Sequence, residues 1–280
     1  MKMPKYDEIG YWSEVKLDII RKYASAYSTI MNKQKKIRSY LYIDAFAGVG
    51  VHIKKQTREF VTGSPLNALV ISPPFPEYHF IDLAGDKVDK LCEIVGERRD
   101  VSFHKGDCNK VLLAEVFPRC RYEDYRRALC LLDPYGLNVN WEVLQKAGEM
   151  KSIEIFYNFM IMDANMNVFW RSPDKVQPGQ VARMDAVWGD RSWHQAAYIK
   201  TLGLFGEMEE KTTNKAVIDA FRGRLRKVAG FEYVPEPMPM RNSKGSVIYY
   251  LFFASPNRTG AKIVEDIFDN YRNKGVTSWQ

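Results

Sequence analysis

The sequence has few of the residues that build metal sites and disulfide frameworks. Its 280 residues include only four cysteines and four histidines. The cysteines form no CxxC pair and the histidines form no HExxH or HxxxH pattern. The sequence therefore predicts neither a structural metal site nor a disulfide framework. We expect free or buried thiols at four positions: Cys92, Cys108, Cys120 and Cys130.

Long apolar runs are also missing. No run approaches the roughly 18 residues that a membrane span requires, and the N-terminal MKMPKYDEIGYW has mixed charge and no apolar core of the signal-peptide kind. Hydrophobic residues make up 46% and charged residues 27% of the chain, as in folded globular proteins. We expect a cytoplasmic protein that does not contact the membrane.

Acidic residues are scarce in two segments of a chain with net charge +7. Residues 1–38 hold nine Lys or Arg against four Asp or Glu, and residues 211–230 hold six against one. Such segments are compatible with phosphate contacts, although a solvated helix face explains them equally well. Charge alone does not identify the partner.

Apolar strands alternate with amphipathic helices over the first 160 residues. Short apolar runs of the kind found in buried parallel strands occur at 40–46, 77–83, 101–107, 126–136 and 152–161. A helix is expected in each interval; the one over 63–72 has Ser64 as its N-cap and Pro65 at its first position. This alternation predicts an open parallel sheet with helices on both faces.

The rest of the chain completes this fold. Apolar residues at helical spacing predict an amphipathic helix over 12–34, and two strands at 231–240 and 246–255 predict a closing hairpin. We therefore predict a doubly wound, mostly parallel seven-stranded sheet of the Rossmann-like methyltransferase kind. Residues 1–38 would carry the N-terminal helix and 39–280 the main domain, with a helical or irregular cap inserted at about 163–210.

Four of the predicted strands end in an aspartate: Asp44, Asp82, Asp107 and Asp133. One aspartate after a strand is often a turn former or a helix cap. Ligands of open α/β sheets, however, bind beyond the carboxyl ends of the strands. Four acids in succession, the first followed by the glycines of FAGVG, therefore indicate a ligand site.

The common phosphate-binding patterns do not fit these residues. The segment GVGVHI lacks the third glycine of GxGxxG, and Asp82 lies 34 residues past Gly48, whereas a dinucleotide site has its acid about 20 residues on. There is no GxxxxGK[ST] segment. Nicotinamide, flavin and ATP are accordingly less well matched than S-adenosylmethionine.

S-adenosylmethionine has a cationic amino-acid end, a ribose and an adenine. Asp44 could anchor the amino end, the glycines would let the cofactor approach the backbone, Asp82 would accept from the ribose hydroxyls and Asp107 from the adenine amino group. The candidate cofactor residues are Asp44, Phe46, Ala47, Gly48, Gly50, Asp82, Leu83, Asp107 and Cys108.

The segment LLDPYG, residues 131–136, ends the fourth strand. It resembles the Asp/Asn-Pro-Pro-aromatic motif of enzymes that methylate exocyclic or amide nitrogens, with one proline in place of two. Asp133 and the Pro134 carbonyl could accept the two N–H groups of an aryl amine, and Tyr135 could stack on its ring. The same four residues also fit a type I turn. The candidate catalytic residues are Asp133, Pro134 and Tyr135.

In order along most of the chain, several segments resemble the three-Cys-motif partner proteins of bacteria and phages: KLDIIRKYASAY, YIDAFAGVG, GSPLNAL, FIDLAGDKVDKL, LLDPYGLNVNWEVL, IEIFYNFMI and YYLFFAS. The match is weakest over 163–210. This resemblance implies a class I S-adenosylmethionine-dependent methyltransferase fold and a companion protein with a three-cysteine, radical-type motif. DPYG is also similar to the Asp-Pro-Phe-Gly of tRNA guanine-N2 methyltransferases.

Three functional hypotheses follow. The first is an S-adenosylmethionine-dependent N-methyltransferase that acts on an amino nitrogen of a nucleic-acid base or nucleotide, with the tryptophans of 163–195 either holding a base or forming the cap core. The second is a non-catalytic or nucleoside-binding scaffold for a three-cysteine radical enzyme. A nuclease ranks third, because its acids would have to share a divalent metal whereas these lie at separate strand ends.

Overall fold

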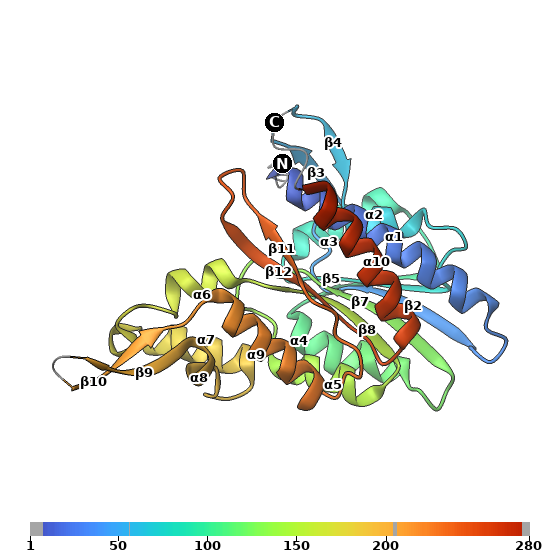
Figure 1. The fold of residues 1–280 in the computed structure, drawn as a ribbon. Coiled ribbons are helices and arrows are strands. Elements are labelled where there is room, and N and C mark those ends of the chain that lie inside the picture. The colour runs from blue at the N-terminus through green and yellow to red at the C-terminus, as the bar shows by residue number, and fades with distance from the viewer. Residues whose placement is uncertain (1–7, 56, 204–205, 276–280) are drawn as a thin grey trace.

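One seven-stranded sheet forms the centre of the molecule (Figure 1). The computed structural model describes residues 8–55, 57–203 and 206–275; residues 1–7 of the predicted N-terminal segment lie outside this part. In spatial order the strands are β11 (Met238–Arg241), β12 (Val247–Ala254), β8 (Ile153–Phe159), β7 (Arg126–Leu132), β2 (Ser39–Asp44), β5 (Glu77–Asp82) and β6 (Val101–Lys105).

The strand directions confirm the predicted mostly parallel sheet. Strands β8, β7, β2, β5 and β6 run parallel to one another. Strand β12 is antiparallel to β8, and β11 is antiparallel to β12. The carboxyl ends of the five parallel strands therefore meet at one edge of the sheet, where Asp44 and Asp82 are the last residues of β2 and β5.

Apolar side chains alternate between the two faces of the sheet. In β2, Tyr40 and Tyr42 pack into the core of one face, and Leu41 and Ile43 into the core of the other. The first face is covered by α1 (Tyr11–Lys33), α2 (Ser64–Leu69), α3 (Gly85–Val95) and α10 (Arg258–Gly275). The second is covered by α4 (Cys108–Val111), η1 (Leu112–Val116), η2 (Phe117–Cys120), α5 (Trp141–Met150) and α9 (Asn214–Lys227).

Helix α1 crosses the first face beside α10 (Figure 1). Its apolar side chains, among them Ile19, Ile20 and Tyr23, are buried in the core of this face. Lys16 lies in the same helix and is also buried, at 8% exposure. A buried lysine needs a partner, and that partner lies at the carboxyl edge described below.

Two details of the predicted elements are wrong. Gly63, not Ser64, is the N-cap of α2, and Ser64 is the first helical residue. Only the end of the segment 231–240 forms strand β11, since Pro235 and Pro237 cannot donate to a ladder. Before them Tyr233 makes a single bridge to Ser255.

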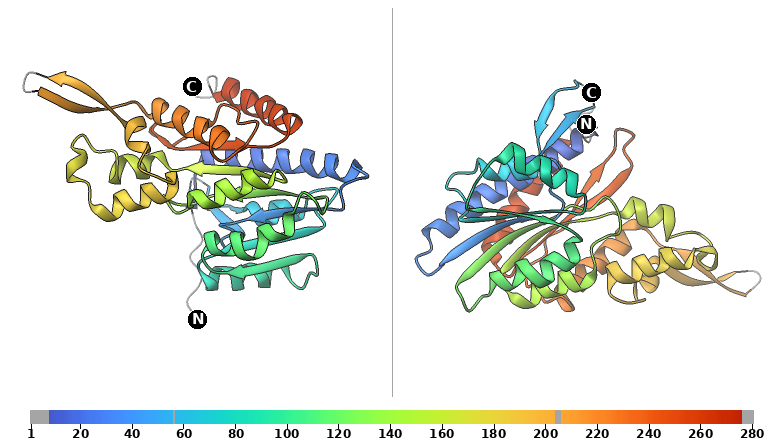
Figure 2. Two further views of the ribbon diagram at one scale, coloured as in Figure 1. Left: turned by 90° about the horizontal axis from the view of Figure 1, so that it is seen from below. Right: turned by 180° about the vertical axis from the view of Figure 1, so that it is seen from behind.

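Two small sheets lie outside the predicted pattern. Strands β3 (Val51–Lys54) and β4 (Phe60–Thr62) form a hairpin that β1 (Glu8–Ile9) extends. Strands β9 (Tyr198–Gly203) and β10 (Gly206–Lys211) form a second hairpin, which projects from the body of the molecule (Figure 2). Both are short and carry few apolar residues, so neither has the buried-strand pattern.

The segment between β8 and α9 is mostly helical. It contains α6 (Ile161–Asn167), η3 (Pro173–Lys175), α7 (Pro178–Trp188) and α8 (Trp193–Ala197), followed by the β9–β10 hairpin. Trp188 and Trp193 are 2% exposed and belong to the core, whereas Trp170 is 38% exposed. Among the described residues, no helix is both long enough and apolar enough to cross a membrane.

Candidate functional site

A pocket of about 220 Å³ lies at the carboxyl edge of the sheet. Its walls come from β1, the first turns of α1, the loop after β2, β3, the first residue of α2, the loop after β7, the carboxyl end of β8 and the amino end of β12. We call it the carboxyl-edge pocket. The residues used below that line it are Lys16, Phe46, Ala47, Gly48, Ser64, Asp133, Pro134, Tyr135, Asn158 and Tyr249.

The glycine loop after β2 is held in place by Asp82. Gly48 and Gly50 have φ values of 61° and 78°, a backbone region that favours glycine. The Gly48 N–H donates to Asp82 Oδ2 at 2.9 Å, and the Ala84 N–H donates to Asp82 Oδ1 at 2.8 Å. A carboxylate accepts about four hydrogen bonds, so Asp82 retains capacity for a hydroxyl group.

The two glycines have different surroundings. A methyl group on Gly48 would meet no atom within 4 Å, so this residue faces open space on the pocket wall. A methyl group on Gly50 would lie 2.6 Å from Leu91 Cδ1. Gly48 therefore keeps the pocket accessible, whereas Gly50 permits close packing of the loop against α3.

Asp44 is fully buried beneath this loop. Its Oδ1 accepts from the Phe46 N–H at 3.1 Å. Its Oδ2 has no partner of hydrogen-bond geometry among the described residues, although the Ser64 hydroxyl interacts with the carboxyl group. Burial raises the pKa of Asp44 to about 7, against the opposing effect of Ser64 and the Phe46 N–H. An ammonium group would complete its coordination.

Asp133 is engaged by two side chains. The Lys16 ammonium donates to its Oδ2 and the Asn158 amide donates to its Oδ1. Although burial opposes it, the nearby Asp133 carboxylate raises the pKa of Lys16 above its ordinary value. Both groups of the ion pair are largely shielded, with side-chain exposures of 10% for Lys16 and 25% for Asp133. Sequence reasoning assigned Asp133 as an acceptor for the amine and did not predict its ion pair with Lys16.

The rest of the Asp-Pro-aromatic segment faces the same pocket. Pro134 and Tyr135 line it, and Tyr135 is 69% exposed. The Lys87 ammonium lies 5.7 Å from the centre of the Tyr135 ring. Tyr135 thus offers an accessible aromatic face next to Asp133.

Six of the candidate cofactor residues do not line the pocket: Asp44, Gly50 and Asp82, described above, and three more. Asp107 caps α4, because its Oδ1 accepts from the Asn109 N–H at 2.8 Å and from Asn109 Nδ2 at 2.9 Å. Cys108 is buried, and burial raises the pKa of its thiol to about 12. Leu83 is 78% exposed beyond the end of β5. Leu83 follows Asp82 at the end of β5, and Asp107 and Cys108 follow β6, the neighbouring edge strand.

Among the pocket residues that sequence reasoning did not name as site residues are three with polar groups at the centre of the site: Lys16, Asn158 and Tyr249. A signal existed for Asn158, which is the amide in an otherwise apolar end of β8, YNFMI. Lys16 carried a weaker signal, since it lies between the buried residues Val15 and Leu17. Only the fold places Tyr249 of β12 at this edge.

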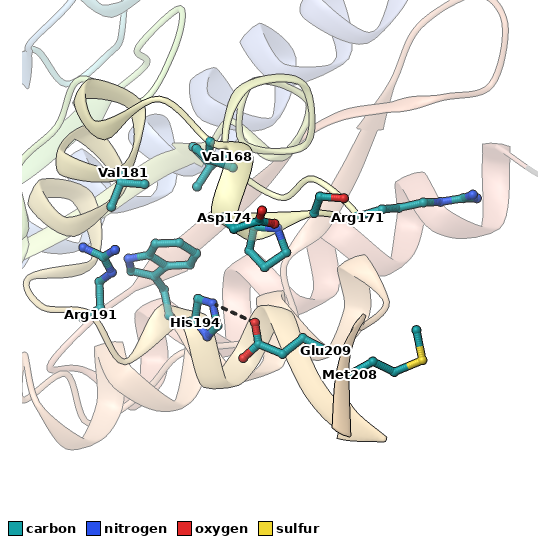
Figure 3. Close-up of a pocket in the computed structure, with 12 residues that line it drawn as sticks. Val168, Arg171, Asp174, Val181, Arg191, His194, Met208 and Glu209 are labelled. Atoms are coloured by element: carbon teal, nitrogen blue, oxygen red, sulfur yellow. Dashed lines mark ion pairs between the residues drawn. The ribbon is translucent and has the colours of Figure 1, made fainter. Parts of the chain in front are cut away.

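A larger cavity of about 550 Å³ lies in the segment between β8 and α9 (Figure 3). It is lined by the segments carrying Val168 and Arg171, by α7 and α8, and by β10. Two of its lining residues form an ion pair, with His194 Nε2 3.5 Å from Glu209 Oε2. None of the strand-end acids lines it, so we place the candidate site at the carboxyl-edge pocket.

Comparison with known proteins supports the fold. No protein-family model and no curated protein matches this chain. Among solved structures, protein LPL1258 from Legionella pneumophila, of the DUF519 family, has a TM-score of 0.56 at 10% identity, over 94% of this chain and 91% of that one. No comparison supports the three-Cys-motif partner family specifically.

Two methyltransferases are also similar. One is a putative S-adenosylmethionine-dependent methyltransferase from Listeria monocytogenes, with a TM-score of 0.40 at 8% identity over 82% of this chain and 97% of that one. The other is magnesium protoporphyrin IX methyltransferase from Synechocystis with bound S-adenosylmethionine, with a TM-score of 0.37 at 12% identity over 86% and 78%. The strand order given above, with the antiparallel strand β12 between β8 and β11, is that of the Rossmann-like methyltransferase fold.

Proposed function

We propose that this protein is an S-adenosylmethionine-dependent N-methyltransferase whose acceptor is an amino nitrogen of a nucleic-acid base. The observation that carries the proposal is the buried carboxyl group of Asp44, whose Oδ2 has no hydrogen-bond partner of suitable geometry among the described residues. It lies under a glycine loop at the ligand-binding edge of a methyltransferase fold.

The residues present fit the cofactor. Asp44 would bind the amino end, Gly48 would let the methionyl part lie against the backbone, and Asp82 has lone pairs left for the ribose hydroxyls. Phe46, Ala47 and Gly50 shape the same loop. Leu83, Asp107 and Cys108 would border the adenine, with Asp107 accepting from its amino group while it caps α4.

When bound, the cofactor supplies an electrophilic methyl group: the amine lone pair forms the N–C bond, the S–C bond breaks with its electron pair left on sulfur, and nitrogen loses a proton. Asp133 accepts an N–H group of the amine and then takes this proton. Lys16 and Asn158 hold the carboxylate in one orientation. Pro134 offers a carbonyl acceptor and Tyr135 a stacking surface.

The acceptor we propose is nucleic acid. Support comes from the exposed aromatic ring of Tyr135, from Lys87 beside it, and from the excess of basic residues in 1–38 and 211–230. A base would have to leave its stack to reach Asp133. We place the reaction in the cytoplasm, with no role for a membrane.

A scaffold for a three-cysteine radical enzyme is the second candidate. It would keep the fold and the nucleoside site but transfer no methyl group. The ion pair between Lys16 and Asp133 favours the scaffold, since the lysine already occupies one acceptor position of the proposed catalytic carboxylate. The resemblance to three-Cys-motif partner proteins is the other support.

Isothermal titration of the full chain with S-adenosylmethionine tests the cofactor. We expect one site per chain and competition by S-adenosylhomocysteine; no heat and no competition would end the proposal. Transfer of a labelled methyl group to bulk RNA and DNA then separates the two candidates. Bound cofactor without transfer, together with a stoichiometric co-purifying protein, would favour the scaffold.

A matched pair of variants locates the chemistry. The double variant Lys16→Met with Asp133→Ala removes the ion pair as a unit and should bind the cofactor as the wild type does, while transfer falls by at least 100-fold. Tyr250→Phe changes a neighbouring residue of β12 whose side chain packs against the other face of the sheet, and should transfer normally. Turnover by the double variant would remove Asp133 from the mechanism.

A further inference from the structure

Two buried polar atoms on the wall of the carboxyl-edge pocket have no hydrogen-bond partner within residues 8–55, 57–203 and 206–275. They are Oδ1 of Asn158 and the hydroxyl of Tyr249. Asn158 is 1% exposed and Tyr249 is 8% exposed, so bulk water does not satisfy them. Native proteins pair nearly all buried polar groups. Two such atoms on one pocket indicate groups that a ligand satisfies.

The orientation of the Asn158 amide is determined by its neighbour. Asn158 Nδ2 donates to Asp133 Oδ1. Exchanging the amide nitrogen and oxygen would set an oxygen against the carboxylate, which repels it. Oδ1 is therefore the atom left over, and it is an acceptor that requires a donor from the ligand.

Tyr249 supplies the complementary group. Burial raises the pKa of Tyr249 to about 12, so at neutral pH the hydroxyl keeps its proton and can donate it. Lys16, which donates to Asp133, lies 5.7 Å from the centre of the Tyr249 ring. Acceptors on Asn158 and Asp133 and a donor on Tyr249 thus share one pocket.

Beside Asn158 and Tyr249, the charge of the pocket selects against a cationic acceptor. The Lys16 ammonium balances the Asp133 carboxylate, and the two groups form an ion pair. An alkylammonium such as a protein lysine would add a second positive charge, and the other carboxylate that lines the pocket, Glu8, already pairs with Arg58. Burying an unbalanced charge is costly. The arrangement favours a neutral amine.

We propose, building on the function proposed above, that Asn158 and Tyr249 recognise the edge of an amino-substituted heteroaromatic ring. The exocyclic amine donates to Asn158 Oδ1 and Asp133, and the unprotonated ring nitrogen beside it accepts from the Tyr249 hydroxyl. Amino-bearing nucleobases present this edge. A glutamine side chain also pairs a donor with an acceptor, but it lacks the ring that the exposed face of Tyr135 would stack on.

The test compares Tyr249→Phe with Tyr250→Phe in the full chain. Removing the Tyr249 hydroxyl breaks no hydrogen bond within the described residues, so we expect an unchanged melting temperature and unchanged S-adenosylmethionine affinity. The probes are fluorescein-labelled single-stranded oligothymidylates, either unmodified or with one central adenine, cytosine or guanine. Anisotropy reports their binding, and labelled methyl groups report transfer.

For the wild type and Tyr250→Phe we expect preferential binding of at least one amine-bearing strand over the thymine-only strand, and methyl transfer to it. For Tyr249→Phe we expect that preference to disappear and kcat/KM to fall by about tenfold. Equal preference and transfer by both variants would overturn the inference, as would transfer to a glutamine peptide but to none of the strands. If the wild type does not bind S-adenosylmethionine, the proposed function fails first, and the anisotropy comparison still tests the recognition of the base edge.

Discussion

Helix α1 and strand β8 meet at two polar clusters, one at each end of the strand. At the amino end, the Glu154 carboxyl group accepts from the Tyr23 hydroxyl and, at 3.0 Å, from Ser255 Oγ. Burial raises the pKa of Glu154 to about 7. Every oxygen of this buried acid has a partner, so the cluster is complete without a ligand.

The carboxyl edge of the sheet also has a buried acid, Asp44 at the end of β2, but its hydrogen bonding is incomplete. Burial raises the pKa of Asp44 to about 7 as well, but its Oδ2 has no partner of hydrogen-bond geometry among the described residues. Asn158, four residues after Glu154 on the same face of β8, also has an orphan oxygen. Burial and pKa do not separate the two ends. Hydrogen-bond satisfaction does, and this is why we interpret only the carboxyl end as a ligand site.

The largest change in unfolding free energy is expected when the ion pair at the carboxyl end is broken. Asp133→Ala leaves the Lys16 ammonium buried without its partner. Removing one member of a buried pair costs about 3–5 kcal/mol of unfolding free energy, and the partial exposure of Asp133 favours the lower value. Adding Lys16→Met should recover most of that loss, as measured by chemical denaturation. If the single and double variants are equally unstable, the pair does not carry the stability of this end.

A slightly smaller effect concerns the amino end. The folded-state pKa of Glu154 is about 7 against an ordinary value of 4.5, so the folded protein binds more protons than the unfolded chain between these pH values. Stability contributed by this group is complete below about pH 4.5 and is lost as the pH rises through 7. The loss is on the order of 3 kcal/mol. Glu154→Gln should flatten this slope and leave cofactor binding unchanged.

Denaturation midpoints between pH 4.5 and 8 measure this slope, with Asp44→Asn as the matched variant. Asp44→Asn should flatten a similar slope, because the pKa of Asp44 is also raised to about 7. Unlike Glu154→Gln, it should weaken S-adenosylmethionine binding. Loss of cofactor affinity in Glu154→Gln with none in Asp44→Asn would reverse the assignment of the two ends.

The sequence predicted the central part of the fold well because buried parallel strands carry a strong local signal. The succession of β2, β5, β6, β7 and β8 along the chain follows from their apolar runs and the helices between them. The acids at their ends follow from the same pattern. The short hairpins, such as β3–β4, could not be predicted this way, since they are polar segments whose pairing depends on neighbours.

The site itself was only half visible in the sequence. The glycine loop directly follows β2 and the segment with Asp133 directly follows β7, so the local sequence pattern of a strand end indicates both. Lys16 looks like one of the many charged residues of an amphipathic helix, and only the packing of α1 across the sheet brings it to Asp133. Tyr249 belongs to β12, whose position beside β8 is a property of the topology. Lys16 and Asp133 are 117 positions apart in the chain, so no local pattern can indicate their contact.

A third prediction concerns the pH dependence of cofactor binding at Asp44. If the cofactor ammonium pairs with the Asp44 carboxylate, binding requires Asp44 to be ionised, and burial holds its pKa at about 7. The association constant should therefore fall by up to about tenfold for each pH unit below 7, about 1.4 kcal/mol per unit. Titration calorimetry at pH 5.5, 6.5 and 7.5 measures this, and Asp44→Asn should show a flat profile. A flat profile for the wild type would separate Asp44 from the amino end of the cofactor.

The smallest changes in stability are expected from replacing one glycine at each cluster, Gly260 at the amino end and Gly48 at the carboxyl end. A methyl group on Gly260 would lie 2.5 Å from the Tyr23 hydroxyl and 3.0 Å from Glu154 Oε1, inside the complete cluster, whereas one on Gly48 would meet no atom within 4 Å. Gly260→Ala should cost about 2 kcal/mol through overpacking. Gly48→Ala should cost about 1 kcal/mol, because an L-residue at φ 61° is strained. Thermal denaturation should rank the two in this order, while cofactor titration ranks them in the opposite one, since only the methyl group on Gly48 enters space that a ligand would fill. Equal cofactor affinity in both variants would mean that the open space beside Gly48 is not the cofactor site.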